Sequence, residues 1–558
     1  MSSLPFTEDS NDLLVLDSRN IADAAVADTM QQIEQIGLEQ YEAYVDERLV
    51  NQRTPISDTI KRNNLHLFSR PPVKGNSSKQ QQISSLKNNC SLFSRLYIAS
   101  QVRDGDLCEF FQHENQPCPP SLSQMGALRG GTKSDLLTCL QDLAPVNVPH
   151  SPTGEVTCTI LDGAAIVNML PPRTAKTFQD YATDIFLPYI TSQLQYVTRL
   201  DIVWDEYISD SLKAGARSKR GKGVRRRVEP SSAVPGNWSA FLRIADNKSE
   251  LFSYLATVAV SIDTSKQVIS THHVNVICKN QQDTSSLAPC THEEADTRMF
   301  LHLEDAVRDG HNKVSIRTVD TDVVVLAVTS AQRLNLAELW IAFGVGKNFR
   351  FFAAHEIAAV LGPEKCIALP MFHAFTGCDT VSFFGGKGKK TAWDTWKTYN
   401  EVTPAFSALA ARPTLQTIQE WIGPLERFVI LMYDRSSSQE CVNEARKQLF
   451  TQKGRAMECL PPTQAALTQH IKRAAYQAGY CWSQMVIKVP ELPSPNEWGW
   501  KKTDDGWEAH WTTLPEAAQA CRELIKCSCK KSCRGRCKCK KAALPCTSLC
   551  FCGGNCTD

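Results

Sequence analysis

The chain has 558 residues, which is too long for a single hydrophobic core and predicts two or three domains. Its apolar content of 42% is enough to build them. Its formal net charge of +2 excludes a uniformly basic protein, so any nucleic-acid surface requires local clusters of Lys and Arg. No stretch reaches the roughly 18–20 apolar residues of a membrane span, and the acidic, polar N-terminal sequence is unlike a secretory leader.

The first 150 residues carry few periodic signals. Residues 1–85 are polar and rich in Ser, Asn and Gln, and we expect them to be largely disordered apart from one helix over residues 29–47. Residues 86–150 alternate helical stretches, such as 92–102, with turns. They are predicted to form a helical lead-in to the next domain.

From residue 151 to 400, short apolar strands alternate with helices. Strands are predicted over residues 156–161, 200–204, 268–278, 314–319 and 339–343, and helices over 177–197, 249–262 and 293–308. This alternation predicts an α/β domain with a mainly parallel sheet flanked by helices.

The remaining chain is predicted to be helical at first and then rich in Pro and Trp. Residues 401–485 form a helical extension, with helices over 415–432 and 463–478, and residues 486–525 link it to a cysteine-rich module at 526–558. The linker holds four tryptophans, Trp498, Trp500, Trp507 and Trp511. We expect them to pack against the neighbouring domain; a platform on which bases stack is the alternative.

Acidic residues follow several of the predicted strands. Asp162, Asp205 and Asp320 each close an apolar strand. Because ligands of open α/β sheets bind beyond the carboxyl ends of the strands, these acids can meet in one crevice. Other acids stand close to the same strands or at helix starts and turns: Asp322, Glu294, Asp296 and Asp379.

A cluster of carboxylates implies bound cations. Each of these acids alone is typical of a turn or a helix cap. Together they repel one another unless a cation neutralises them, and oxygen-only clusters suit Mg²⁺ or Mn²⁺. Two such ions, ~3.5–4 Å apart, can activate water and stabilise a leaving oxygen. The set therefore predicts phosphodiester hydrolysis.

The order of these motifs resembles the flap-endonuclease/Asteroid branch of the PIN-like nucleases over about residues 155–400. The matching segments are LDG (161–163), VWDEY (203–207), EEAD (293–296), DTD (320–322), GCD (377–379) and GGKGKKTA (385–392). The resemblance implies that seven acids hold two Mg²⁺ or Mn²⁺ ions: Asp162, Asp205, Glu294, Asp296, Asp320, Asp322 and Asp379. Glu-x-Asp stands where the family has Glu-x-Glu, and Glu293 is an alternative ligand. No acid is missing, which favours an active enzyme.

A glycine-rich turn follows the last acid. Glycine allows a backbone to approach a phosphate closely, and lysines add positive charge. In the resembled family the equivalent helix–hairpin–helix, here residues 377–397, grips duplex DNA and can hold K⁺. Gly386, Gly388, Lys389 and Lys390 are the predicted contacts. The alternative is a plain glycine-rich surface turn. The histidines near these motifs are expected to be structural or solvated; for His373, four residues before Gly377, contact with the phosphate is the alternative.

A basic run follows Asp205. Residues 213–227 carry eight Lys or Arg and no acid. The resembled family places its arch over the active site here, which implies that Lys213 and Arg217 face the reacting phosphate and that Lys219 and Arg220 contact DNA. A disordered basic loop or a nuclear-import signal is the alternative.

The C-terminal segment has metal-type cysteine spacing. Nine cysteines cannot all pair as disulfides, but they can fill the twelve ligand positions of three tetrahedral zinc ions if three of them bridge. They are Cys527, Cys529, Cys533, Cys537, Cys539, Cys546, Cys550, Cys552 and Cys556. The segment resembles the tesmin-type CXC module, which implies a Zn₃Cys₉ cluster that binds DNA.

A single copy is present, and Arg536 stands where the family has an aromatic residue. General attraction of the DNA backbone by the interleaved basic side chains is therefore expected, through Lys530, Lys531, Arg534 and Arg536. A zinc knot that serves only folding or protein contacts is the alternative.

These features together predict a Mg²⁺- or Mn²⁺-dependent nuclease of the nucleus or cytosol that acts on DNA with branches, flaps or ends. The combination resembles reading frames carried by mobile elements or domesticated from them. A catalytically inactive DNA-binding or chromatin protein is the alternative from another class, and an RNA-directed ribonuclease is a third. No membrane association is expected, and protein partners cannot be inferred from the sequence.

Overall fold

The computed structural model describes most of the chain between residues 107 and 517 and parts of the N-terminal region. The described ranges are 13–15, 20–22, 24–56, 58, 60, 97, 107–143, 151–152, 156–208, 210–214, 223–280, 283–334, 336–451, 457–504 and 506–517. Arg217, Lys219, Arg220 and the cysteine module lie outside them, as does nearly all of the helix predicted over 92–102. Within these ranges, no helix combines the length and apolar character of a membrane span.

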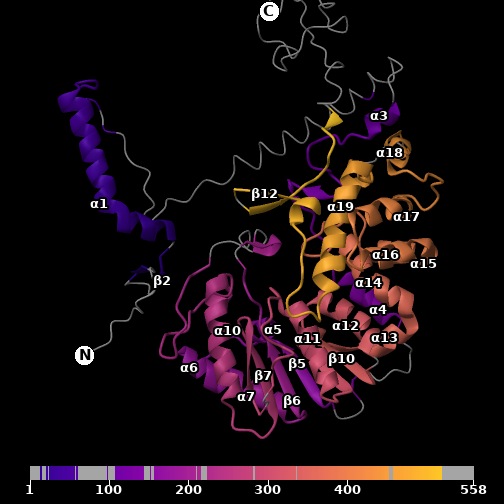
Figure 1. Ribbon diagram of the computed structural model, residues 1–558, viewed down its shortest axis with the longest axis horizontal. Coiled ribbons are helices and arrows are strands. Elements are labelled where there is room, and N and C mark those ends of the chain that lie inside the picture. The colour runs from indigo at the N-terminus through magenta and orange to yellow at the C-terminus, as the bar shows by residue number, and fades with distance from the viewer. Residues whose placement is uncertain are drawn as a thin grey trace, which may run out of the picture.

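A seven-stranded sheet forms the centre of the molecule, in the order β11-β10-β9-β5-β6-β7-β8 (Figure 1). The strands are β5 (Cys158–Asp162), β6 (Arg199–Val203), β7 (Gln267–His272), β8 (Asn275–Lys279), β9 (Lys313–Thr318), β10 (Glu338–Phe343) and β11 (Arg350–Ala353). The five inner strands are parallel, and the edge strands β8 and β11 are antiparallel. The predicted α/β fold class, a mainly parallel sheet flanked by helices, is confirmed.

The strand order reverses at β5. The chain passes from β5 to β6 on one side of it, and later returns to β9 on the other side. Crevices at such reversals are where open α/β sheets bind ligands. The run predicted as one strand over 268–278 is instead the β7–β8 hairpin, because His273, with φ 53°, turns the chain.

Helices cover both faces of the sheet. Neighbouring β5 residues enter different cores, Ile160 on one face and Leu161 on the other, as the two-residue repeat of a strand requires. The Leu161 face packs against α5 (Gly163–Met169), α6 (Phe178–Tyr181), η2 (Ala182–Phe186), α7 (Leu187–Leu194), α9 (Trp238–Phe241) and α10 (Ala245–Val260). The Ile160 face packs against α11 (Ala295–Arg308), α12 (Thr321–Leu334), α13 (Ala354–Leu361) and α14 (Pro363–Phe375).

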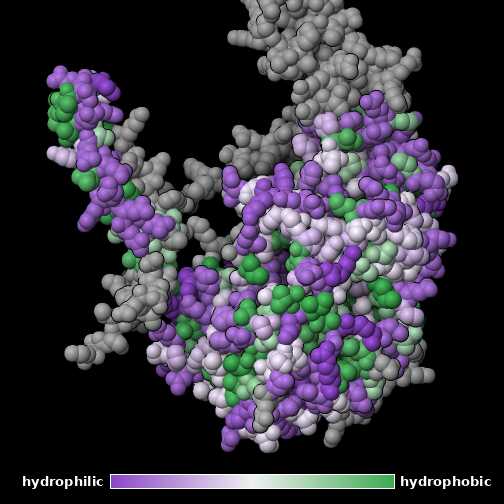
Figure 2. All heavy atoms as spheres, viewed as in Figure 1, coloured by the Kyte–Doolittle hydropathy of each residue, from purple (hydrophilic) through white to green (hydrophobic). Residues whose placement is uncertain are grey.

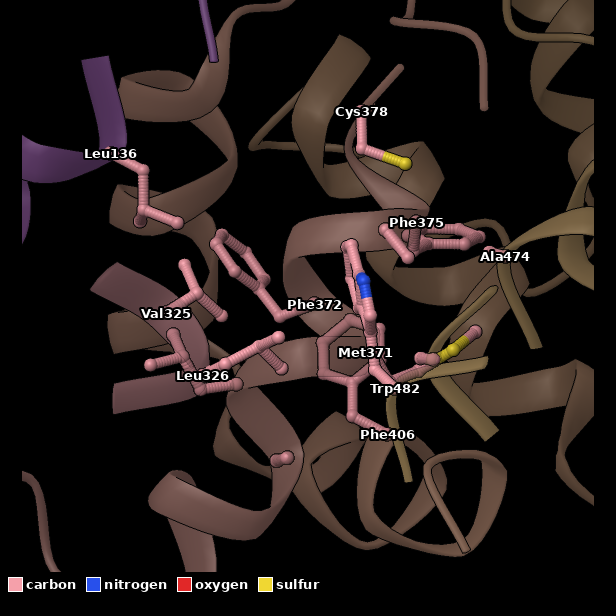
Figure 3. Close-up of a cluster of buried hydrophobic side chains, with 14 of the residues drawn as sticks. Leu136, Val325, Leu326, Met371, Phe372, Phe375, Cys378, Phe406, Ala474 and Trp482 are labelled. Carbon is pink, nitrogen blue, oxygen red and sulfur yellow. The ribbon is translucent and has the colours of Figure 1, made fainter. Parts of the chain in front are cut away.

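The core on the Ile160 face continues without a break into the helices after residue 388. These are α15 (Lys389–Thr398), α16 (Thr403–Leu409), α17 (Leu415–Tyr433), α18 (Val442–Thr451), α19 (Gln464–Tyr476) and η6 (Gln477–Trp482), with the short turns η4 (Asn400–Val402) and η5 (Met457–Cys459). The turn η3 (Gly346–Asn348) lies earlier, between β10 and β11. Figure 3 shows Phe372 and Phe375 of α14 among side chains of the preceding and following helices. The helical extension therefore shares its core with the sheet.

The lead-in segment packs into the same core. It contains α3 (Leu107–Phe111), β3 (Ser123–Gln124), β4 (Ala127–Leu128) and α4 (Asp135–Gln141). Leu136 and Leu140 of α4 are fully buried, and Leu136 faces Val325 and Phe372 in Figure 3. This packing fixes the segment just before α4 against the sheet domain.

Residues 486–517 are ordered against the body, where the sequence analysis expected a linker. After η7 (Pro495–Glu497) they form a hairpin of β12 (Trp500–Thr503) and β13 (Gly506–Ala509). Trp498 and Trp500 are buried, which agrees with the expected packing of tryptophans. Trp507 and Trp511 are half-buried.

The N-terminal region contains β1 (Leu14–Val15), β2 (Asn20–Ile21), α1 (Ala24–Tyr44) and the π-helical turn η1 (Val45–Val50). The helix predicted over 29–47 is confirmed by α1 and η1. Apolar side chains of α1, including Met30, Ile33 and Leu38, are exposed among hydrophilic ones (Figure 2).

Candidate metal centre

Three of the predicted acids, Asp162, Asp205 and Asp320, lie at or just beyond the carboxyl ends of strands. Asp162 is the last residue of β5, and its Oδ1 accepts a hydrogen bond from the backbone N–H of Ala165 in α5, at 2.9 Å. Its Oδ2 accepts from the Thr318 hydroxyl at the end of β9, also at 2.9 Å. Asp162 is therefore fixed between the two central strands.

Asp205 and Asp320 are held in the same way. Asp205 follows β6, and its Oδ1 accepts from the backbone N–H of Ala295 in the first turn of α11, at 3.0 Å. Asp320 follows β9, and its Oδ1 accepts from the backbone N–H of Asp322 in the first turn of α12, at 2.8 Å. The positive end of each helix dipole stabilises the charged carboxylate.

Three acids lie close enough to share one cation. Asp296, Asp320 and Asp322 each offer one carboxylate oxygen, and these oxygens lie within 4.8 Å of one another. They come from α11, the end of β9 and α12, so the sheet order rather than chain proximity brings them together.

A lysine from the lead-in segment joins these acids to Asp379. The Lys133 Nζ lies 2.8 Å from Asp320 Oδ1, 3.1 Å from Asp322 Oδ1 and 3.2 Å from Asp379 Oδ1. Asp379, in the turn after α14, is the most exposed of the three acids, with 49% of its side chain accessible. The sequence analysis missed Lys133. Its only local signal is its position between Gly130-Gly131 and a helix.

The electrostatics show that the cluster needs positive charge. Burial, followed by the charges of Asp205 and Asp320, raises the pKa of Asp162 to about 7. Burial and the neighbouring Asp322 raise the pKa of Asp320 to about 6, and burial together with Asp320 raises the pKa of Asp296 well above its ordinary value. Carboxyls with raised pKa values in one pocket favour proton or cation binding.

Asp322 behaves in the opposite way. Burial alone would raise its pKa, but the Lys133 ammonium and a hydrogen bond from His373 outweigh burial and hold the pKa well below its ordinary value. The His373 Nε2 lies 2.9 Å from Asp322 Oδ1, and its ring stacks on Trp482. Burial, then the Lys389 charge, lowers the pKa of His373 to about 4, so the ring is neutral and donates to Asp322. His373 is thus structural, as expected, and it also orients a site carboxylate.

Glu294 and Lys213 form an ion pair at the start of α11. Burial alone would lower the pKa of Lys213, but nearby carboxylates, Asp296 first, raise it, so the ammonium stays charged beside the cluster. Lys213 therefore lies beside the acid cluster, and its contact with a reacting phosphate stays a prediction. Glu293, the alternative ligand, accepts instead from the Ser211 hydroxyl at 2.5 Å.

The glycine-rich turn lies between α14 and α15. The backbone N–H of Lys387 donates to the Phe384 carbonyl at 3.1 Å, and Gly386, with φ 67°, supplies the left-handed residue that this turn requires. Gly386, Gly388 and Lys390 are exposed.

The prediction that Lys389 contacts DNA is wrong. Its side chain is 0% exposed and turns inward, donating to the His373 carbonyl and to the Thr376 hydroxyl at the end of α14. The helix end offers unsatisfied carbonyls, which attract this ammonium. Burial lowers the pKa of Lys389 to about 7.

The chain was compared with family models, curated proteins and solved structures, and only solved structures matched. No family model matches the chain, and no curated protein matches it. Among solved structures, the chain is similar to two described as the catalytic core of Rad2 in complex with DNA substrate, complexes III and II, at 13% and 14% identity. Each match covers 59% of this chain and 97% of the Rad2 chain, with a TM-score of 0.28.

The capacity of the site to bind metal rests on its own side chains. It offers only hard oxygen donors, converging from five separate segments, with three raised carboxyl pKa values. Such a donor set can hold a hard divalent cation.

Proposed function

We propose that this protein is a metal-dependent nuclease that hydrolyses phosphodiester bonds in DNA. The observation that carries the proposal is that carboxylates from the ends of β5, β6 and β9 and the start of α11 gather at the carboxyl edge of the sheet. The order of acid-bearing motifs, which resembles that of the flap-endonuclease branch of PIN-like nucleases, supports the same activity.

Asp296, Asp320 and Asp322 would hold one divalent ion. A second ion would take its ligands from the remaining predicted acids, Asp162, Asp205, Glu294 and Asp379. Bound Mg²⁺ or Mn²⁺ would activate water for attack and stabilise the leaving oxygen.

The protein's own groups prepare the pocket for a phosphate. His373 and the helix N–H groups orient the carboxylates, and Lys213 supplies a fixed positive charge beside them. A charge already in place costs no reorganisation when negative charge develops on the phosphate. Arg217 would add to it from the neighbouring basic run.

The preferred substrate is DNA with branches, flaps or ends. The exposed turn at Gly386, Gly388 and Lys390 would bind the duplex backbone. The same turn would also hold a K⁺ ion. Lys219, Arg220 and the basic residues of the cysteine module would add attraction for phosphates. The nucleus is the proposed location, and the origin of the chain in a mobile element is part of this proposal.

The first test is a panel of labelled flap, duplex, single-stranded DNA and RNA substrates with Mg²⁺ or Mn²⁺. We expect cutting of at least one DNA substrate, loss of cutting with EDTA, and a fall of at least about 100-fold in Asp320→Ala, because that carboxylate belongs to the closest metal-binding group. Asp184→Ala, an exposed acid of η2, is the matched control and should cut normally. Equal cutting by Asp320→Ala and the parent chain would refute the proposal.

A second test concerns the C-terminal cysteines. Elemental analysis of the purified chain should find about three zinc ions, because nine thiolates with three bridging positions satisfy three tetrahedral sites. Replacing Cys533 and Cys537 by Ser should lower the zinc content and weaken DNA binding at low salt. One zinc ion or none in the parent chain would disprove the cluster.

One observation favours the alternative of a DNA-binding protein without catalysis. Lys133 already neutralises three of the proposed metal ligands, as a permanent substitute for a metal ion would. The substrate panel separates the two, since the alternative predicts binding of the same DNA without metal-dependent cutting.

A further inference from the structure

A cavity of about 790 Å³ lies beside the candidate metal centre, under the β12–β13 hairpin. Its volume is in the range of sites that hold small organic ligands, roughly 300–1,000 Å³. A larger cavity, of about 1030 Å³, lies against the sheet near Tyr189, Arg317 and Phe351, and none of the predicted site residues lines it.

The hairpin over the nearer cavity is firmly held. The Arg473 Nη1 of α19 donates to the carbonyls of Gly499 and His510, at 3.0 and 2.8 Å, on either side of the hairpin. The Lys502 Nζ also pairs with Asp210 Oδ2 at 2.6 Å, in the loop that leads to Lys213. Figure 1 shows β12 beside α19. The wall of the cavity is thus built into the fold.

The cavity and the metal centre share residues. Asp379, whose carboxylate contacts Lys133 at 3.2 Å, lines the cavity, as does Leu212, the neighbour of Lys213 in the chain. A strand with one phosphate at the carboxylates would therefore have a neighbouring nucleotide at the mouth of the cavity.

The opposite wall consists of indole rings. Trp500, Trp507 and Trp511 all line the cavity. Trp507 and Trp511 are half-buried, and a cation lies over one face of each ring: Lys502 Nζ is 5.5 Å from the Trp507 ring centroid, and Arg473 Cζ is 5.3 Å from that of Trp511. A ligand would stack on the opposite faces. Trp500 is 5% exposed, and its buried Nε1 has no hydrogen-bond partner among the described residues. A buried donor without a partner is costly unless a ligand accepts from it.

These features favour a ligand with a flat aromatic ring and hydrogen-bond acceptors on the edge of that ring. Indole faces stack on any aromatic ring, and the Trp500 N–H can donate to a ring nitrogen or carbonyl oxygen. Lys501 also lines the cavity, but its ammonium lies 3.7 Å from the carboxylate of Glu508, another lining residue, so the lining adds no net positive charge. A nucleobase has the flat ring and the edge acceptors that the indoles select.

We propose that this cavity binds an unpaired nucleobase of the strand whose phosphate lies at the candidate metal centre. The base stacks against Trp507 and Trp511 and accepts a hydrogen bond from Trp500. This inference rests on the nucleic-acid binding of the proposed function, but not on catalysis. It makes the hairpin a selector for strands with at least one unpaired nucleotide near the cut.

The test replaces one nucleotide at a time by an abasic site along the single-stranded arm of a flap DNA. Binding is measured with full-length chains that carry Asp320→Ala, so that the strand stays intact. We expect one or two adjacent abasic positions to weaken binding about 5- to 100-fold, the effect of losing a stacked base. Trp507→Ala should weaken binding of the intact strand by a similar factor and lose this dependence on position.

Three variants show whether the effect belongs to the ring. Trp507→Phe keeps an aromatic face and should restore most of the binding. Thr503→Ala, in the same hairpin but outside the cavity, and Trp421→Ala, on distant α17, should bind like the parent chain. Circular dichroism of Trp507→Ala should match that of the parent chain, which checks that the variant is folded.

The outcomes separate this inference from the proposed function. If the parent chain cuts DNA but no abasic position matters, the base pocket is refuted and the nuclease stands. If binding depends on position and Trp507 but nothing is cut, the pocket stands and the nuclease fails. Failure to bind any nucleic acid overturns both, and a position effect confined to ribonucleotide arms assigns the pocket to RNA.

Discussion

Three carboxylates of the candidate metal centre, each at the end of a strand, are positioned by backbone N–H groups at the start of a helix. Asp162, Asp205 and Asp320 each accept a hydrogen bond from an N–H group in the first turn of α5, α11 or α12. These bonds hold the acids in place at separations where they repel one another. Burial, and then this repulsion, raises the pKa values of Asp162 and Asp320, which makes a cation the natural partner.

Lys133 provides that partner in the described structure, and this leads to a prediction on metal affinity. Lys133→Met removes the ammonium that contacts Asp320, Asp322 and Asp379 while keeping a long side chain. With these carboxylates uncompensated, we expect Mn²⁺ to bind roughly tenfold more tightly, which is about 1.4 kcal/mol. Isothermal titration of Mn²⁺ into the metal-free protein measures the change.

Lys347→Met, at an exposed turn away from the site, serves as the charge-matched control and should leave Mn²⁺ affinity unchanged. Unchanged or weaker Mn²⁺ binding by Lys133→Met would show that the ammonium does not compete with the metal. In that case Lys133 would be a supporting residue of the metal-bound site.

At the level of elements, the two adjacent lysines of the α14–α15 turn have opposite fates. Lys389 is drawn into the carbonyl end of α14, and Lys390 remains exposed. Both follow Gly388 and carry the same charge, so no local rule distinguishes them. The direction of each side chain depends on how α15 packs against α14.

The β12–β13 hairpin depends on a glycine at its entry. Gly499 has φ 81°, and a Cβ there would lie 2.5 Å from the Gln469 carbonyl oxygen of α19. Gly499→Ala should therefore destabilise the protein by about 1–3 kcal/mol and loosen the hairpin. Thermal unfolding followed by tryptophan fluorescence reports both effects.

Gly236→Ala is the control, because a Cβ at that loop position meets nothing within 4 Å and φ is not positive. Its unfolding free energy should stay within about 0.5 kcal/mol of the parent. A Gly499→Ala protein as stable as this control would contradict the close approach of the hairpin to α19.

At the scale of the whole molecule, the acid cluster links stability to pH and metal. The folded-state pKa of Asp162, about 7, lies above the unfolded value of 3.8, so the folded state binds more protons between these values. Stability of the metal-free protein should therefore fall as pH rises from about 4 to 7. Mn²⁺ should raise the Tm more at pH 7.5 than at pH 5, where protons compete for the carboxylates.

Calorimetry of the parent chain and of Asp162→Asn isolates this contribution. The variant lacks the titrating carboxyl, so its Tm should fall less over the same pH interval. Parallel Tm profiles for the two proteins would mean that Asp162 is not strained by burial and by its neighbours.

The sequence by itself determined the elements and the chemistry of the candidate site. Strand-then-acid patterns placed Asp162, Asp205 and Asp320 at the carboxyl ends of strands, because local periodicity and an acid at a helix start are readable over a few residues. The parallel sheet followed from the alternation of strands and helices.

Tertiary structure alone decided which side chains from distant segments meet. Lys133 reaches the acids of residues 320–379 because α4 packs into the core of α12 and α14, and His373 orients Asp322 across the same core. The segment expected to be a linker packs against the body instead, where Arg473 of α19 donates hydrogen bonds to the backbone carbonyls of Gly499 and His510. Contacts of this kind depend on packing between elements far apart in the chain, for which a single sequence carries no local signal.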